Sequence, residues 1–192
     1  MIRETKNGAE FITDLQVRHV MRYVQAMRYL PEGGLVLDAA CGTGYGTKIL
    51  SRNHDMLGLD NDEDALREAL QRAVNGCNFI HGDIRDGKWF ADNLDAIVSI
   101  ETIEHFDQVE GWKILKNFHT WLKDKGVLII STPYCKTSGP SPVTKTHLWE
   151  YCLTDLEMSL TDAGFAIEFI KTERETGKAG RLGYCMVKAI KR

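Results

Sequence analysis

Four acidic side chains in this sequence stand where they could bind a ligand together. Asp38, Asp60, Asp83 and Glu101 each come at or just past the end of a short apolar run that is typical of a buried strand. The carboxyl ends of parallel strands meet along one edge of a sheet, and such sheets bind their ligands there. We therefore expect four carboxylates along one rim.

A glycine-rich turn, Gly42-Thr43-Gly44, follows the first of these acids. Glycine lets the backbone turn sharply between a strand and a helix and approach a ligand closely. Nicotinamide and flavin enzymes use a similar turn, so the glycines alone are a weak signal. Asp38 just ahead of them would suit an amine or another cation and would repel a pyrophosphate. A tight strand–helix turn with a purely structural aspartate is the alternative.

The run Asp38-x-Ala40-Cys41-Gly42-x-Gly44 resembles the cofactor loop of class I S-adenosylmethionine-dependent methyltransferases, with alanine at position 40 where that family often has glycine. The resemblance covers nearly the whole chain and implies S-adenosylmethionine as cofactor. It implies that Asp38 faces the amino group of the methionyl part, that Asp60 accepts both ribose hydroxyls and that Asp83 meets the adenine amine. The full set of cofactor-binding residues that it implies is Tyr23, Asp38, Ala40, Gly42, Gly44, Tyr45, Asp60, Asn61, Asp83, Ile84 and Ile100.

Further motifs resemble a subgroup of small methyltransferases associated with glycan and surface-polysaccharide synthesis. They are His19-x-x-Arg22-Tyr23, Gly44-Tyr45-Gly46, Glu101-Thr102-Ile103-Glu104-His105 and Ser131-Thr132-Pro133. In that comparison the amino-terminal helix that carries Arg22 and Tyr23 would lie over the bound cofactor. An ordinary helix surface is the alternative for these two residues.

Glu101, Glu104 and His105 are spaced so that one helical turn would place them on one face. Together with His147, they could hold a divalent ion, with Mg²⁺ or Mn²⁺ favoured over Zn²⁺. The set resembles that of small-RNA 3′-end 2′-O-methyltransferases, which hold Mg²⁺ or Mn²⁺ with a Glu-x-x-Glu-His run and a later histidine. Ubiquinone-pathway O-methyltransferases share the run. Three interpretations stay open: a metal site, His105 as a base without a metal, and structural roles only.

The reaction that the resemblance implies is in-line transfer of a methyl group from a sulfonium to an acceptor oxygen. The protein then mainly aligns the acceptor with the methyl carbon and sulfur, and assists the loss of the hydroxyl proton. We predict a catalytic set of His105, His147 and Glu101, with His105 as the first choice for the base and His147 as the second. The proline-rich segment 133–147 is the predicted substrate loop, because its length suggests a functional role.

The elements that must position these residues alternate along the chain. Apolar runs predict strands at 35–37, 56–59, 78–80, 96–100, 127–130, 165–171 and 184–190. Helical periodicity and capping residues predict helices at 11–30, 47–52, 63–74, 108–122 and 154–163. The alternation predicts an α/β, Rossmann-like, doubly wound sheet of seven mostly parallel strands, with the last two strands as an antiparallel edge hairpin. We expect a single domain over 1–192, with 1–30 as a helical cap over the cofactor.

Composition excludes several classes of protein. A chain of 192 residues that is 43% apolar and 27% charged is neither disordered nor collagen-like. A net charge of −3 gives no broad electrostatic footprint for nucleic acid. Five cysteines without a C-x-x-C pair suggest reduced thiols in a cytoplasmic protein. Since no apolar run approaches the roughly 20 residues that span a bilayer, we expect no membrane insertion.

The leading hypothesis is therefore O-methylation of a small-molecule or glycan hydroxyl. Two alternatives belong to other classes. One is a metal-dependent 2′-O-methyltransferase acting on an RNA end, which the net charge disfavours. The other is a non-catalytic S-adenosylmethionine-binding partner of another methyltransferase.

Overall fold

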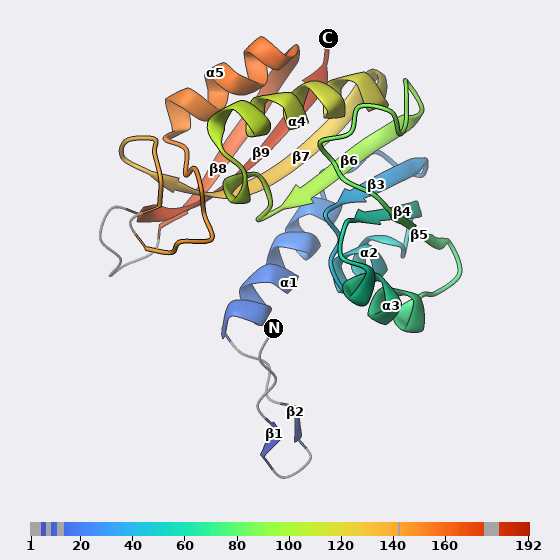
Figure 1. The fold of residues 1–192 in the computed structure, drawn as a ribbon. Coiled ribbons are helices and arrows are strands. Elements are labelled where there is room, and N and C mark those ends of the chain that lie inside the picture. Colours follow the sequence, from blue (N-terminus) through green and yellow to red (C-terminus); the bar gives the residue numbers. More distant parts are fainter. Residues whose placement is uncertain (1–4, 7–8, 11–13, 142, 175–180) are drawn as a thin grey trace.

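A seven-stranded sheet forms the centre of the computed structural model, which describes residues 5–6, 9–10, 14–141, 143–174 and 181–192 (Figure 1). The strands of this sheet are β3 (Leu35–Ala39), β4 (Asp55–Asp60), β5 (Cys77–His81), β6 (Leu94–Ile100), β7 (Leu122–Cys135), β8 (Phe165–Arg174) and β9 (Arg181–Lys191). The helices are α1 (Asp14–Met27), α2 (Tyr45–Leu50), α3 (Glu63–Arg72), the single 3₁₀ turn η1 (Ile103–His105), α4 (Gln108–Trp121) and α5 (Leu153–Ala163). A two-residue pair, β1 (Thr5–Lys6) and β2 (Ala9–Glu10), precedes them.

The strand order is β5-β4-β3-β6-β7-β9-β8. The five neighbouring strands β5, β4, β3, β6 and β7 run parallel to one another. Strand β9 is antiparallel to both of its neighbours, β7 and β8. The first strand of this sheet along the chain, β3, lies near its middle. The next two strands, β4 and β5, follow toward one edge, and β6 then pairs with the other side of β3. The gap between the carboxyl ends of β3 and β6 is thus the point where the strand order reverses. This arrangement confirms the predicted Rossmann-like fold with its antiparallel edge hairpin.

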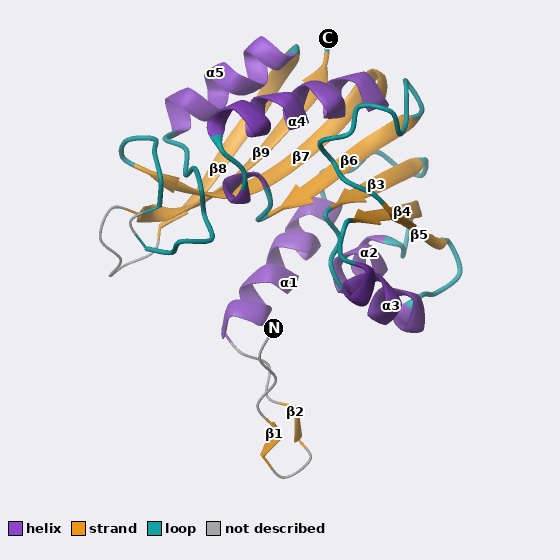
Figure 2. Ribbon diagram, viewed as in Figure 1, coloured by secondary structure: helices purple, strands orange, loops and turns teal. Residues whose placement is uncertain are grey.

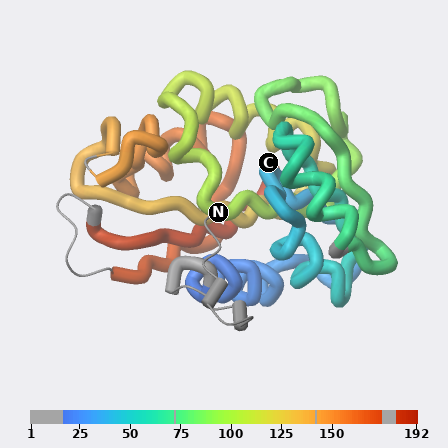
Figure 3. Tube along the Cα trace, turned by 60° about the horizontal axis from the view of Figure 1, so that its bottom comes forward, coloured from blue at the N-terminus to red at the C-terminus, as the bar shows by residue number. Residues whose placement is uncertain are grey.

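Helices cover both faces of the sheet (Figure 2). On one face α4 and α5 bury Phe118, Trp121 and Leu160 against the sheet. On the other face α1 and α2 bury Tyr23 and Leu50, and the tube view places α1 on the side of the sheet away from α4 and α5 (Figure 3). Because side chains alternate along a strand, β3 contributes Leu37 to the first core and Val36 to the second.

Several helix ends follow the predicted capping chemistry. Asp62 caps α3, where its Oδ1 accepts the backbone N–H groups of Asp64 and Ala65 at 2.9 and 3.1 Å. Gly164 ends α5 in the left-handed conformation, with φ +108°. The acids Glu63 and Asp64 stand in the first turn of α3, where they oppose the positive end of the helix dipole.

Two expectations about local structure are wrong. The loop expected over 133–147 begins later, because β7 continues to Cys135 in register with β9. A pairing between segments about fifty residues apart cannot be read from local composition. The helical turn expected over Glu101, Glu104 and His105 is also absent, since only Ile103–His105 forms a 3₁₀ turn and Glu101 precedes it with φ +54°.

All five cysteines are free thiols: Cys41, Cys135 and Cys185 are buried, and Cys77 and Cys152 are half-buried. Among the described helices, none combines the length and the apolar character that crossing a bilayer would require.

Candidate functional site

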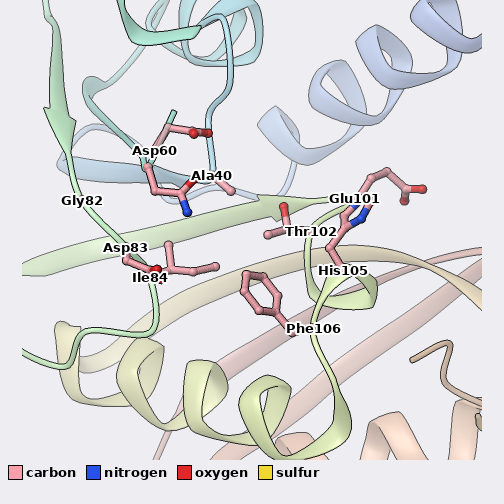
Figure 4. A pocket seen from close by; sticks show the side chains of 10 residues that line it. Ala40, Asp60, Gly82, Asp83, Ile84, Glu101, Thr102, His105 and Phe106 are labelled. Carbon is pink, nitrogen blue, oxygen red and sulfur yellow. The ribbon is translucent and has the colours of Figure 1, made fainter. Parts of the chain in front are cut away.

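A cavity of about 260 Å³ opens at the carboxyl ends of the central strands (Figure 4). It is lined by Ala40, Asp60, Asn61, Gly82, Asp83, Ile84, Glu101, Thr102, His105 and Phe106. Asp60 and Asp83 lie on one side of it, Glu101 and His105 on the other, and the ring of Phe106 lies between them, while the carboxylate of Glu101 points outward. Residues after β3 and after β6 both line the cavity, so it occupies the point where the strand order reverses. Its volume is near the lower end of small-molecule sites.

The carboxylate of Asp60 shapes the glycine turn beside the cavity. Its Oδ2 accepts the backbone N–H of Gly42 at 2.7 Å, and its Oδ1 accepts the backbone N–H of Asp62 at 2.9 Å. Each carboxylate oxygen can accept a second hydrogen bond, so Asp60 is held in place with acceptor capacity left for a diol. Gly42 has φ +51°, which favours glycine, and a Cβ on Gly44 would lie 2.7 Å from a side chain of α3.

Asp38 is not among the residues that line the cavity, and its side chain points from β3 toward α1 and α2. It is fully buried. Its Oδ1 accepts the hydroxyl of Tyr23 at 3.1 Å and its Oδ2 accepts the hydroxyl of Thr47 at 2.6 Å. Burial raises the pKa of Asp38 from 3.8 to about 6. The carboxyl group therefore joins α1 and α2 behind the glycine turn.

Asp83 is held by a neighbouring arginine. The guanidinium of Arg85 donates to both carboxylate oxygens, with Nη2 at 2.6 Å from Oδ2 and Nε at 3.0 Å from Oδ1. These hydrogen bonds keep the pKa of Asp83 below its ordinary value. Nη1 of Arg85 also donates to Glu110 of α4 at 2.8 Å. Arg85 thus connects Asp83, which lines the cavity, to Glu110 of α4 through two ion pairs.

Glu101 is held by residues behind the cavity. Its Oε1 accepts the hydroxyl of Ser131 at 2.8 Å and lies 3.7 Å from Nε of Arg22. Arg22 is buried, and its guanidinium lies 3.5 Å above the ring of Tyr184. Nη1 of Arg22 is buried without a hydrogen-bond partner. Helix α1 thereby reaches the rim of the cavity through Arg22.

Three of the four predicted Glu and His side chains converge. One ligand atom from each of Glu104, His105 and His147 lies within 4.8 Å of the other two. The two imidazole rings stand edge to face, with centroids 4.9 Å apart. Glu101 is outside this three-residue group, which we call the Glu-His-His cluster. His105 belongs both to the cluster and to the cavity lining, so the two adjoin.

The electrostatics of the Glu-His-His cluster suit a cation. Glu104 is buried, and Oε2 accepts the hydroxyl of Thr132 at 3.0 Å, but Oε1 is buried without a hydrogen-bond partner. Desolvation, and next the charge of Glu101, hold the pKa of Glu104 well above its ordinary value. Desolvation also lowers the pKa of His105. A bound divalent cation would stabilise both the ionised carboxylate and the neutral imidazole.

The structure divides the residues expected around the cofactor. Those that line the cavity are Ala40, Asp60, Asn61, Asp83 and Ile84. The lining does not include Tyr23, Asp38, Gly42, Gly44, Tyr45 and Ile100. Gly82, Thr102 and Phe106 also line the cavity and were missed, although each is a direct sequence neighbour of an expected site residue.

Comparison with known proteins gives one family match. Residues 36–126 match the family described as "Methyltransferase domain". Among curated proteins, the "Probable S-adenosylmethionine-dependent methyltransferase" of Mycolicibacterium smegmatis is 29% identical over 156 residues, which cover 79% of this chain and 59% of that protein. The "Probable tRNA methyltransferase 9B" of Mus musculus is 34% identical over 105 residues, which cover 55% of this chain and 23% of that protein. The chain therefore spans less than two thirds of the length of either relative.

Solved structures share the fold. A chain from the complex of the Haloferax volcanii methyltransferase activator Trm112 aligns with a TM-score of 0.74 at 15% sequence identity. The alignment covers 92% of this chain and 91% of that one. At this identity the likeness concerns the arrangement of helices and strands.

Proposed function

We propose that the chain is an S-adenosylmethionine-dependent methyltransferase that methylates a hydroxyl group of a small-molecule or glycan acceptor. The match of residues 36–126 to a methyltransferase domain, the curated relatives and the strand order support this proposal. The observation that carries this proposal is the position of His105. The residue lines the cavity at the point where the strand order reverses, and it also belongs to the Glu-His-His cluster. A donor bound in the cavity would thus adjoin groups that can take a proton from an acceptor.

The cavity residues fit S-adenosylmethionine, which supplies an electrophilic methyl group on a sulfonium. Asp60 is oriented by the glycine turn and would accept the two ribose hydroxyls. Asp83 and the apolar side chain of Ile84 would border the adenine. Arg22, whose Nη1 is buried without a hydrogen-bond partner and whose Nε lies near Glu101, would stand at the methionyl side of this arrangement. The helical cap over the cofactor is then α1, within the expected 1–30 segment.

The Glu-His-His cluster would act on the acceptor side. In the metal-free version, His105 would accept the proton of the acceptor hydroxyl through Nε2 as the new bond to the methyl carbon forms, because its Nδ1 donates to the carbonyl of Thr146. In the metal version that lone pair would bind the ion instead. The buried Oε1 of Glu104 is an acceptor without a donor, which fits a bound cation. Glu104, His105 and His147 would hold Mg²⁺ or Mn²⁺, and that ion would lower the pKa of the acceptor hydroxyl. Segment 133–147, which ends at His147, would form a wall of the acceptor site.

The metal and metal-free versions differ in measurable ways. If a metal takes part, EDTA should abolish methyl transfer, Mg²⁺ or Mn²⁺ should restore it, and Mn²⁺ bound to the free protein should be visible by electron paramagnetic resonance. Glu104→Ala and His147→Ala should then lose activity and keep cofactor affinity. If His105 is a lone base, EDTA should have no effect and His105→Ala should lower turnover by roughly 10²–10⁴-fold. His119→Gln, in the last turn of α4 and outside both the cavity lining and the Glu-His-His cluster, is the matched control.

An RNA acceptor is the second candidate. The partial match to a protein named as a tRNA methyltransferase favours it, whereas the net charge of −3 does not. RNA binding should weaken steeply with salt, because phosphate contacts release counterions. RNA that is methylated, and bound with such a salt dependence, would replace the small-molecule proposal. Incubation with methyl-labelled cofactor and fractionated lysate, followed by mass spectrometry, would identify the acceptor class directly.

A further inference from the structure

One guanidinium group fixes the carboxylate of Asp83 at one end of the cavity. Oδ1 of Asp83 accepts the backbone N–H of Arg85 at 2.8 Å and its Nε–H at 3.0 Å. Oδ2 of Asp83 accepts the Nη2–H of Arg85 at 2.6 Å and its Nε–H at 3.0 Å. A forked contact of this kind fixes the orientation of a carboxylate. Because Asp83 lines the cavity and Arg85 does not, the guanidinium fixes a wall residue without being part of the wall.

The guanidinium of Arg85 is itself fixed by the start of α4. Its Nη1 donates to Oε1 of Glu110 at 2.8 Å, and this glutamate stands in the first turn of the helix. Its central carbon also lies 5.7 Å from the ring centroid of Phe106, another residue of the cavity lining. All three nitrogens of the guanidinium are thus engaged, so the group cannot turn without losing contacts. A lysine, with one ammonium group on a flexible stem, cannot make the same set of contacts.

The contact with Arg85 determines what Asp83 offers to a ligand. The hydrogen bonds from Arg85 lower the pKa of Asp83 in spite of desolvation, and the side chain of Asn61 adds to this effect. Asp83 is therefore ionised at neutral pH, and an ionised carboxylate only accepts hydrogen bonds. A ligand group at this end of the cavity is favoured if it is a donor. The 6-amino group of adenine is such a donor, and a purine without this group loses the hydrogen bond.

We propose that Arg85 is a positioning residue for the purine end of the cavity, which fixes the carboxylate of Asp83 so that the site selects a purine by its 6-amino group. This role rests on the proposed function in one respect, because the purine of the cofactor must lie beside Asp83. Arg85 acts through Asp83 and is absent from the cavity lining. Its substitution should therefore change the selection of the purine more than the binding of the rest of the cofactor.

Calorimetry with S-adenosylhomocysteine and with its 6-deamino analogue, in which hydrogen replaces the purine amino group, measures this selection. The wild type should bind S-adenosylhomocysteine about 10–100-fold more tightly than the analogue, the scale of a hydrogen bond to a charged group. Arg85→Ala should weaken S-adenosylhomocysteine by about 10-fold and leave the affinity for the analogue nearly unchanged. Arg85→Lys, which keeps a cation without the fork, should restore only part of the affinity ratio.

Lys88→Ala is the matched control. Lys88 stands in the same loop, pairs with Asp86 at 3.4 Å and does not line the cavity. Its removal takes one cation from this loop, as Arg85→Ala does, but leaves the contacts of Asp83 in place. The ratio of the two affinities should therefore equal that of the wild type, and a ratio lowered as far as in Arg85→Ala would contradict a specific role for Arg85.

Two further results would overturn the proposal. One is a wild type that binds both ligands equally well, and this measurement needs no variant to fold. The other is an Arg85→Ala variant that weakens both ligands by the same factor, as a general loosening of the loop would. Nuclear magnetic resonance of the Asp83 carboxyl carbon tests the contact in the ligand-free protein: its pKa should rise in Arg85→Ala, and an unchanged pKa would contradict the contact.

The failure of this role and the failure of the proposed function can be told apart. If the affinity ratio behaves as expected but no acceptor is methylated, the proposed function fails and the role of Arg85 stands. If methyl transfer to a hydroxyl occurs and the ratio is the same with and without Arg85, the proposed function stands and the role of Arg85 fails.

Discussion

Replacing Asp38 with asparagine should stabilise the folded protein at neutral pH. Asp38 is fully buried, and burial raises its pKa to about 6, against the hydrogen bonds from Thr47 and Tyr23 that lower it. Between pH 4 and pH 6 the folded chain keeps a proton that the unfolded chain has released. Since stability falls with rising pH wherever the folded state binds more protons, the wild type should lose stability across this window.

The magnitude follows from the pKa. A rise from 3.8 to about 6 means that the unfolding free energy of the wild type is about 3 kcal/mol lower above pH 6 than below pH 4. Asparagine has no such proton, but its NH₂ group needs an acceptor where Asp38 had only donors around it, which costs about 1 kcal/mol. Asp38→Asn should therefore be about 1 kcal/mol less stable than the wild type below pH 4 and about 2 kcal/mol more stable above pH 6.

Urea unfolding monitored by tryptophan fluorescence from pH 4.5 to pH 8 would measure this difference. Asp83→Asn is the matched control with the opposite sign. Because Arg85 lowers the pKa of Asp83, that variant should be less stable than the wild type at neutral pH, and the gap should close as the pH falls. If Asp38→Asn is destabilised equally at pH 4.5 and pH 8, the two hydroxyl donors fully offset the desolvation of Asp38, and the reasoning is refuted.

Three more outcomes can be checked with the purified protein. Calorimetry should show that Asp60→Ala weakens S-adenosylhomocysteine binding by about 1.5–3 kcal/mol, the scale of lost charged hydrogen bonds; tight NADH binding without any response to S-adenosylhomocysteine would contradict the cofactor assignment. Gly46→Ala should lower the free energy of unfolding, measured with urea, by about 1–3 kcal/mol, because its Cβ would lie 2.1 Å from the ring of Tyr23. Gly139→Ala is the control: its Cβ would meet no atom within 4 Å, so its stability should be near that of the wild type. A thiol reagent at about pH 8 should label only the two half-buried cysteines before unfolding, and early labelling of all five would contradict their burial.

Much of the fold could be predicted because its signals are local. The apolar runs that form β3, β4 and β6 each end near an acid, and Asp62 stands at the N-cap of α3 as its side-chain chemistry requires. The absence of a helix between the last two strands was enough to predict their antiparallel hairpin.

The parts that failed depend on contacts between distant segments. Residue spacing suggested a common face for Glu101 and Glu104, but the left-handed φ of Glu101 turns the backbone before η1 begins. The role of Asp38 at the cofactor stays a prediction, whereas its contacts with Tyr23 and Thr47 depend on which face of β3 meets α1. The burial of Glu150 could not be predicted, because a glutamate is ordinarily exposed and its burial follows from a pairing with Gly139 across the loop.

The bridge between Gly139 and Glu150 has a consequence for how such a protein can diversify. Both ends of the intervening segment are fastened to each other, so its middle can change in length and composition without moving either end. The segment also lies outside residues 36–126, which match the methyltransferase domain and include the residues that line the cavity. If segment 133–147 forms a wall of the acceptor site, as proposed, exchange of residues 140–146 between homologous chains would be a route to new acceptors with an unchanged cofactor site.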